Sequence, residues 1–310
     1  MAQATILRPG MMMTVQDAGR PGLLRFGVSG SGPMDPEALE IANALVGNDP
    51  GAACLEFAYL GGEIRLDEDR SIAVCAAATE LRIDGARVPA WCSHRLRAGQ
   101  VLAIGATPGS VWGYVAVSGG IATPPVLGSR ATHLRSGLGG LEGRALREGD
   151  CLPLGTGAPG PERMLRQGWR SRTGPIRVVM GPQDRAFALE ERARFLSEPF
   201  IASARRDRMA MVLDGPRIAA AGGHDIVSDG TLAGSVQVPG SGQPTVLMAD
   251  RQTTGGYPKI ATISSVDLPR LAQMPVGHRF RFQAISQPQA EEVLICARRA
   301  FRRALDQVRG

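Results

Sequence analysis

The stretch "SIAVCAAATELRIDGARVP", residues 71–89, favours a β-rich fold. It opens with an apolar run at residues 71–78, which is typical of a buried strand. A shorter run follows at residues 80–85, and Gly85 separates two alternating pieces, as the turn of a β-hairpin does. The stretch therefore predicts one buried strand followed by a hairpin.

The rest of the chain has the same character, because its 40 glycines and 22 prolines cut it into short apolar pieces. Further strands are predicted at residues 63–67, 101–105, 111–119, 176–181 and 245–250. A glycine-containing turn before an alternating strand recurs at residues 97–104, 147–154 and 275–282. This recurrence is typical of a β-barrel, and it occurs in both halves of the chain.

Few helices are expected. In residues 34–47, Asp35 is placed as the N-cap, Pro36 at the first helical position and Gly47 as the stop. Residues 289–305 predict an amphipathic helix with its arginines outward. One more short helix falls within residues 182–200.

The length of 310 residues is large for one hydrophobic core, so two domains are expected. Residues 155–175 are rich in glycine, proline and charge, and we place the boundary there. The predicted fold is mainly β, with a barrel-like domain at residues 1–165. A second barrel-like domain, which carries the C-terminal helix, follows at residues 166–310.

Composition argues against several classes of protein. With 44% hydrophobic and 21% charged residues the chain is ordinary globular material. No apolar run approaches the roughly 20 residues that a membrane span needs, and no signal peptide is recognisable at the N-terminus. We therefore expect a cytoplasmic protein with no membrane partner. The net charge of +6 comes from scattered arginines, and without a reading motif it does not predict a nucleic-acid partner.

The cysteines and histidines predict no metal site. The five cysteines are widely spaced and contain no CxxC pair, which favours buried free thiols. The four histidines show no spacing typical of metal ligands.

Lys259 is the most conspicuous single residue, because it is the one lysine of the chain. All the other residues among the 35 lysines and arginines are arginines. It lies in "DRQTTGGYPKIAT", residues 250–262, where glycines alternate with polar side chains. Glycine-rich backbone beside amide, hydroxyl, carboxylate and ammonium groups suits a small polar ligand, although two tight hairpins would also explain it. The candidate binding residues of this region are Gln237, Gln243, Arg251, Thr253, Gly255, Gly256 and Tyr257.

Two further stretches carry candidate binding residues. In residues 14–35 the candidates lie among glycines and lead to a helix N-terminus, which favours an anion; alternatively, Asp35 acts only as a helix cap. The candidates here are Gln16, Asp17, Arg20, Ser31, Met34 and Asp35. In residues 203–216, Asp207 and Arg208 are expected to form an ion pair or a ligand clamp.

Several motifs occur together and in a fixed order. They are "TVQDAGRPG" (14–22), "SGPMDPEALEIANALVGN" (31–48), "GYVAVSGGI" (113–121), "GLGGLEGRALREGD" (137–150), "DRMAMVLDGP" (207–216) and "IVSDGTLAGSVQVPGSGQPTVLMADRQTTGGYPKIATI" (226–263). By these motifs the chain resembles the family of allophanate hydrolase subunit 2, also called KipA or the C subunit of 5-oxoprolinase. The same family includes the carboxyltransferase domain of urea carboxylase.

The resemblance implies two cyclophilin-like β-barrel domains and a hydrolase made of several chains. Its members usually work with a KipI-like component of the B type and often with a LamB/YcsF-like component of the A type. Together these open the cyclic amide 5-oxo-L-proline to L-glutamate with ATP, and ATP would be bound through the complex. In this role Lys259 would stabilise developing negative charge together with the backbone N–H groups of Gly255 and Gly256. Asp250 or Asp17 would act as base or orient water.

Two other functions remain open. The carboxyltransferase relatives move CO2 from carboxybiotin to urea, so biotin would be a cofactor in that case. A non-catalytic protein that antagonises a KipI-like kinase inhibitor is the other alternative. Lys259 could equally be a structural ion-pair partner of Asp250.

Overall fold

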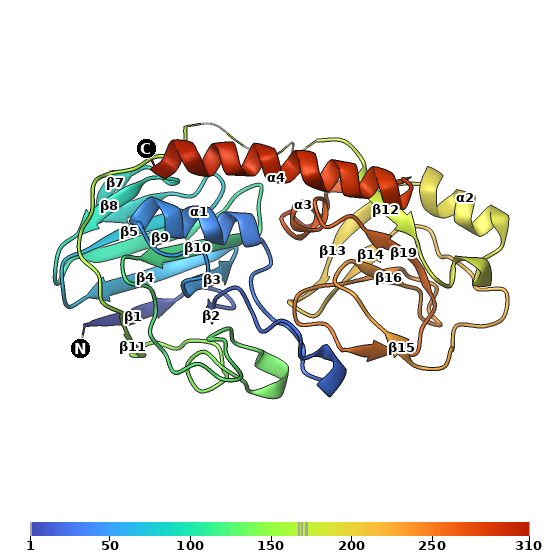
Figure 1. The fold of residues 1–310 in the computed structure, drawn as a ribbon, viewed down its shortest axis with the longest axis horizontal. Coiled ribbons are helices and arrows are strands. Elements are labelled where there is room, and N and C mark those ends of the chain that lie inside the picture. Colours follow the sequence, from blue (N-terminus) through green and yellow to red (C-terminus); the bar gives the residue numbers. More distant parts are fainter. Residues whose placement is uncertain (1, 167, 169, 171–172, 310) are drawn as a thin grey trace. The chain divides into compact units, whose positions relative to one another are not determined.

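The computed structural model describes residues 2–166, 168, 170 and 173–309, and it confirms the mainly β fold (Figure 1). The chain divides into two compact units. The first comprises Met1–Arg20, Ser31–Trp169 and Phe301–Gly310, and the second comprises Pro21–Gly30 and Arg170–Ala300. The single boundary near residue 165 stays a prediction, and positions 167, 169, 171 and 172 of the expected linker lie outside the described residues.

The first unit contains two antiparallel sheets. In sheet order, the larger consists of β11 (Cys151–Pro153), β1 (Gln3–Pro9), β4 (Leu60–Leu66), β9 (Val101–Ala106), β6 (Leu81–Ile83) and β7 (Ala86–Val88). The smaller consists of β2 (Thr14–Gln16), β3 (Cys54–Ala58), β10 (Trp112–Val117), β5 (Arg70–Cys75) and β8 (Ser93–Leu96). Both sheets contribute to one core, in which Ile6 and Leu102 join Phe57 and Val115. Burial of these apolar faces holds the two sheets together.

The stretch at residues 71–89 folds as predicted, with β5 followed by the β6–β7 hairpin. Ile83 pairs with Ala86, and the two residues between them have positive φ angles, 46° at Asp84 and 83° at Gly85. Such angles at both central positions define the turn that matches the twist of a hairpin.

The helix α1 (Pro36–Val46) packs against β5 and β10 of the first unit. The Asp35 side chain accepts a hydrogen bond from the Ala38 N–H at 3.3 Å, and Gly47 ends the helix with a φ of 77°. Asp35, which is fully buried, therefore acts as the N-cap that the sequence predicted.

An eight-stranded sheet forms the second unit. Its order is β20 (Arg279–Phe280), β13 (Phe200–Arg206), β14 (Ala210–Asp214), β17 (Thr245–Leu247), β16 (Ser235–Gln237), β19 (Lys259–Ile263), β12 (Ile176–Met180) and β21 (Phe282–Ala284). The two edge strands, β20 and β21, are separated in sequence by Arg281 alone, so the sheet curls into a nearly closed barrel. A separate two-stranded sheet pairs β15 (Asp229–Gly230) with β18 (Thr254–Gly255).

Aromatic side chains fill the second unit's core. Phe195 of α2 (Leu189–Ser197) stacks on Phe282 with ring centroids 4.5 Å apart, and the ring centroid of Phe200 lies 5.4 Å from that of Phe282.

The other helices of the chain are α3 (Leu268–Ala272), α4 (Gln287–Arg309) and the short η1 (Leu24–Phe26), η2 (Leu134–Ser136) and η3 (Asp184–Ala186). Across the described residues, no helix combines the length and the apolar character needed to cross a membrane.

Candidate functional site

Lys259 opens strand β19 and is only 3% exposed. The pairing between β16 and β19 contains a β-bulge, after which Gln237 pairs with Lys259. Cross-strand partners project to the same face of a sheet, so the Gln237 and Lys259 side chains share one face of the barrel sheet. Bulges are frequent beside active sites because they redirect a side chain.

The Lys259 ammonium pairs with Asp229. Nζ lies 2.8 Å from Asp229 Oδ2, and the same oxygen accepts from Gln183 Nε2 at 3.1 Å. Gln183 Oε1 in turn accepts from the Lys259 backbone N–H at 3.2 Å, which closes a ring of three residues. The hydrogen bond from Lys259 is the main cause that holds the pKa of Asp229 below its usual value. The sequence expectation of a Lys259–Asp250 ion pair is wrong, since Lys259 meets Asp229 instead.

The segment that carries Asp229 is tied to the glycine-rich loop at residues 252–256. Asp229 pairs with Gly255 in the β15–β18 sheet. The Thr231 N–H donates to the Thr253 carbonyl at 3.0 Å, and the Ile226 N–H donates to the Gly256 carbonyl at 2.8 Å. Two loops far apart in sequence are thereby held together beside Lys259.

Gln237 is 2% exposed and only half of its amide is satisfied. Its Oε1 accepts from Gln252 Nε2 at 3.3 Å, whereas its Nε2 has no hydrogen-bond partner among the described residues. A β-carbon at Gly255 would lie 2.3 Å from that Nε2, so any larger residue there would displace the amide from its position. A buried donor without an acceptor is costly and is a feature expected of a ligand site.

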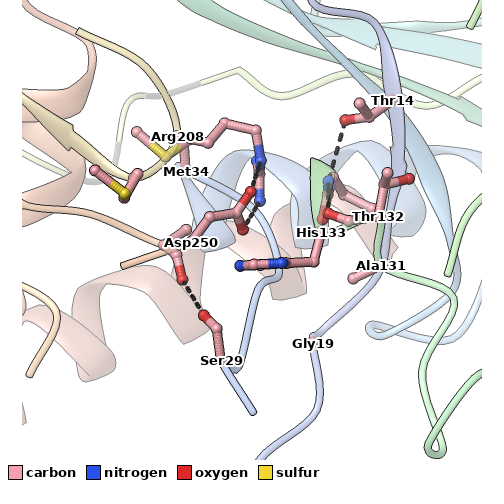
Figure 2. Close-up of polar contacts among 12 residues, drawn as sticks. Thr14, Gly19, Ser29, Met34, Ala131, Thr132, His133, Arg208 and Asp250 are labelled. Atoms are coloured by element: carbon pink, nitrogen blue, oxygen red, sulfur yellow. Dashed lines mark hydrogen bonds and ion pairs between the residues drawn. The ribbon is translucent and has the colours of Figure 1, made fainter. Parts of the chain in front are cut away.

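Arg208 and Asp250 form a buried pair in the second unit (Figure 2). Arg208 Nε and Nη2 donate to the two Asp250 carboxylate oxygens, each at 2.9 Å. Asp207 does not pair with Arg208 as expected, because its carboxylate accepts from the backbone N–H groups of Met209 and Ala210 and shapes the turn. With both oxygens engaged by a guanidinium, Asp250 is better suited to orient groups than to accept a proton.

Arg251 follows directly in the chain and is 9% exposed. Its Nε has no acceptor within the described part of the chain. Burial lowers the pKa of this guanidinium from its ordinary value, and no neighbouring carboxylate offsets that effect.

The candidates at residues 16–20 belong to the first unit and hold a loop. Asp17 accepts from the Ser129 hydroxyl and the Arg130 N–H, each at 2.5 Å, and from Gly19. The Arg20 guanidinium donates to the Ala131 carbonyl at 2.5 Å.

Gln16 Nε2 donates to Thr14 Oγ1 and to the Thr132 carbonyl, each at 3.0 Å (Figure 2). Together with the contacts of Asp17 and Arg20, these bonds fix the segment at residues 129–132. In these contacts the side chains act as a scaffold.

Met34 and Asp35 connect to a buried acid that the sequence analysis did not single out. The Glu56 carboxylate accepts from the Met34 N–H at 2.8 Å and from the Tyr114 hydroxyl at 2.7 Å. The Tyr114 oxygen accepts from the Asp35 N–H at 2.7 Å. Burial and the Glu56 charge raise the pKa of Tyr114 well above its usual value. Ser31, with a φ of 50°, precedes this network.

Other candidates are less engaged. Gln243 accepts from exposed Arg205 at 3.0 Å, apart from the Lys259 ring, and Tyr257 is 42% exposed. Gln183 and Asp229 were missed. Gln183 lies in the turn after Gly181 and outside the quoted motifs, so no local pattern marked it. Asp229 sits in the quoted motif at residues 226–263, where an acid beside glycine was a usable signal.

The described residues contain no cluster of His, Cys, Asp or Glu that could hold a metal ion.

Comparison with known proteins gives consistent relatives. The family model described as carboxyltransferase domain, subdomain A and B, matches residues 26–284. The protein named as the C subunit of 5-oxoprolinase from Escherichia coli (strain K12) is 41% identical over 92% of each chain. A putative urea carboxylase from Emericella nidulans is 32% identical over 92% of this chain but only 24% of its own length.

A solved structure of TTHA0988 is similar in fold, with a TM-score of 0.83 and 35% identity over 91% of this chain. This chain spans about half, 55%, of that solved protein.

Proposed function

Since the chain belongs to the family of the carboxyltransferase domain, subdomains A and B, we propose that it is the C subunit of an ATP-dependent 5-oxoprolinase. One observation carries the proposal: the C subunit of the E. coli 5-oxoprolinase is 41% identical over 92% of both chains. A match that covers both partners almost completely supports a shared role better than a match to one segment of a larger enzyme.

The chemistry to be accomplished is the opening of an unreactive lactam. ATP would phosphorylate the amide oxygen, water would add to the activated carbon, and cleavage of the C–N bond would release L-glutamate, ADP and phosphate. Negative charge gathers on oxygen as water adds, and preorganised donors stabilise it. The Lys259 ammonium, held 2.8 Å from Asp229, and the Gly255–Gly256 backbone are the proposed donors of this chain.

We assign no ATP contact to this chain. A KipI-like component of the B type and a LamB/YcsF-like component of the A type are the proposed partners, and the assembled complex would bind ATP. The E. coli relative is named as one lettered subunit of its enzyme, which supports an assembly of several chains.

Transfer of a carboxyl group from carboxybiotin to urea is the second candidate function. The 32% identity to a putative urea carboxylase favours it, although the match covers 24% of that enzyme. In that case biotin on another protein would deliver the carboxyl group.

One preparation can separate the two functions. The chain is purified with its two proposed partners and supplied either with ATP and 5-oxo-L-proline or with carboxybiotin and urea. We expect glutamate in the first mixture and no carboxylated urea in the second. The opposite pattern would reject the 5-oxoprolinase assignment.

A further inference from the structure

The buried basic side chains of the second unit can be compared by their partners. Lys259 meets Asp229 at 2.8 Å, Arg208 meets Asp250 at 2.9 Å, and Arg270 meets Asp267 at 2.6 Å. Each of these cations therefore has an acidic partner in the protein itself, as buried charges normally do.

Arg251 differs from them. It is 9% exposed, and in the described chain no carboxylate lies within ion-pair distance of its guanidinium. Its Nε has no acceptor in that part of the molecule, which is also the case for Arg270 Nε, so the missing carboxylate is what sets Arg251 apart. A buried charge without an acidic partner is unfavourable, and a purely structural position would avoid it by using a neutral side chain.

A second unsatisfied donor is linked to the same loop. Gln237, 2% exposed, receives its one side-chain hydrogen bond from Gln252, the residue after Arg251. Its Nε2 is left without an acceptor among the residues described. A ligand with acceptor oxygens would satisfy donors of this kind.

We propose that Arg251 binds the carboxylate of the small-molecule substrate. A guanidinium matches a carboxylate through two parallel N–H···O bonds, and it keeps its charge when buried. This inference rests on the proposed function and sharpens it. The carboxylate of 5-oxo-L-proline supplies the missing counter-charge, whereas urea has no charged group to offer. Carboxybiotin, the donor in the alternative function, also carries a carboxylate, so the comparison with urea concerns the acceptor substrate alone.

Binding without turnover tests the inference. Calorimetry on the complex of this chain with its two partners, without ATP, compares 5-oxo-L-proline with its neutral amide, 5-oxo-L-prolinamide. The wild-type complex should bind the acid at least about tenfold more tightly, because a charged hydrogen-bonded pair contributes about 1.5–3 kcal/mol. Arg251→Gln should lose that preference while binding the amide as before, and Arg251→Lys should retain part of it.

Arg205→Gln is the matched control, since Arg205 is exposed and pairs with Asp214 at the surface. It should leave both affinities unchanged. Equal binding of acid and amide by the wild type, or an unchanged preference in Arg251→Gln, would overturn the inference. Failure of both Arg251 variants to assemble with the partners would also overturn it, because the guanidinium would then serve a protein contact.

The inference and the proposed function can fail separately. If the wild-type complex binds no 5-oxo-L-proline, the proposed function fails. Thermal shift of the complex with acetate and L-lactate then tests whether Arg251 binds a carboxylate. Stabilisation by these carboxylates that disappears in Arg251→Gln supports the site. No stabilisation by either carboxylate overturns it.

Discussion

Lys259 is buried against a partner that is itself largely in water. The Asp229 side chain is 51% exposed, whereas that of Lys259 is 3% exposed. A pair with one exposed member is screened by solvent and contributes little to stability. The ion pair alone is therefore a weak reason to bury the chain's one lysine, and a role toward a ligand explains it better.

Exchange of Lys259 tests that role. Lys259→Arg keeps the charge but replaces a compact ammonium by a planar fork. We expect 5-oxoproline turnover to fall about 100-fold or more, as when one charge-stabilising donor is lost, with the complex still assembled. The control is Asp229→Asn, which keeps the shape of the partner and should retain most of the turnover. If Lys259→Arg retains full turnover, Lys259 has no part in the mechanism.

The sequence identified the Lys259 loop but not its partner. Lysine usage and the glycine-rich surroundings were visible in the residue pattern. The pairing with Asp229 depends on how β15 meets β18, and the Gln183 bridge depends on how β12 lies beside β19. Such contacts between distant segments are set by tertiary packing, which local pattern does not contain.

At the scale of elements, the β16–β19 bulge and the β15–β18 sheet position the candidate donors. The bulge pairs Gln237 with Lys259, and the small sheet brings Gly255 against the Gln237 amide. The alternating runs predicted the strands well, because period-two burial is a local property. The bulge adds one residue to a ladder, and a single sequence carries no comparable sign of it.

Gly255 and Gly256 offer a matched pair of substitutions. A β-carbon at Gly255 would lie 2.3 Å from Gln237 Nε2, whereas at Gly256 the nearest atom would be 3.5 Å away. Gly255→Ala should displace the Gln237 amide and raise the KM for 5-oxoproline about fivefold to tenfold, the value of one hydrogen bond. Gly256→Ala should change KM by less than about twofold. Steady-state kinetics with melting curves checks both, and equal KM values would contradict the role assigned to Gln237.

At the scale of the whole molecule, the two units exchange segments along the chain. Residues 21–30 belong to the second unit, where the Ser29 hydroxyl donates to the Ala249 carbonyl at 3.4 Å (Figure 2). Phe301–Gly310, at the end of α4, belongs to the first unit. The amino-acid composition becomes rich in glycine, proline and charge at residues 155–175. The loop at residues 21–30, which belongs to the other unit, has no comparable difference in composition. The mainly β class was predictable because turn residues and strand periodicity are distributed along the entire chain.

The central claim is that this chain completes an ATP-dependent 5-oxoprolinase. The most direct measurement is the amount of L-glutamate and of ADP formed from 5-oxo-L-proline by the two partners, with and without this chain. We predict one glutamate for each ADP in the complete complex and no glutamate when the chain is left out. Glutamate formation that is independent of the chain, or a complete complex that forms ADP without glutamate, would contradict the claim.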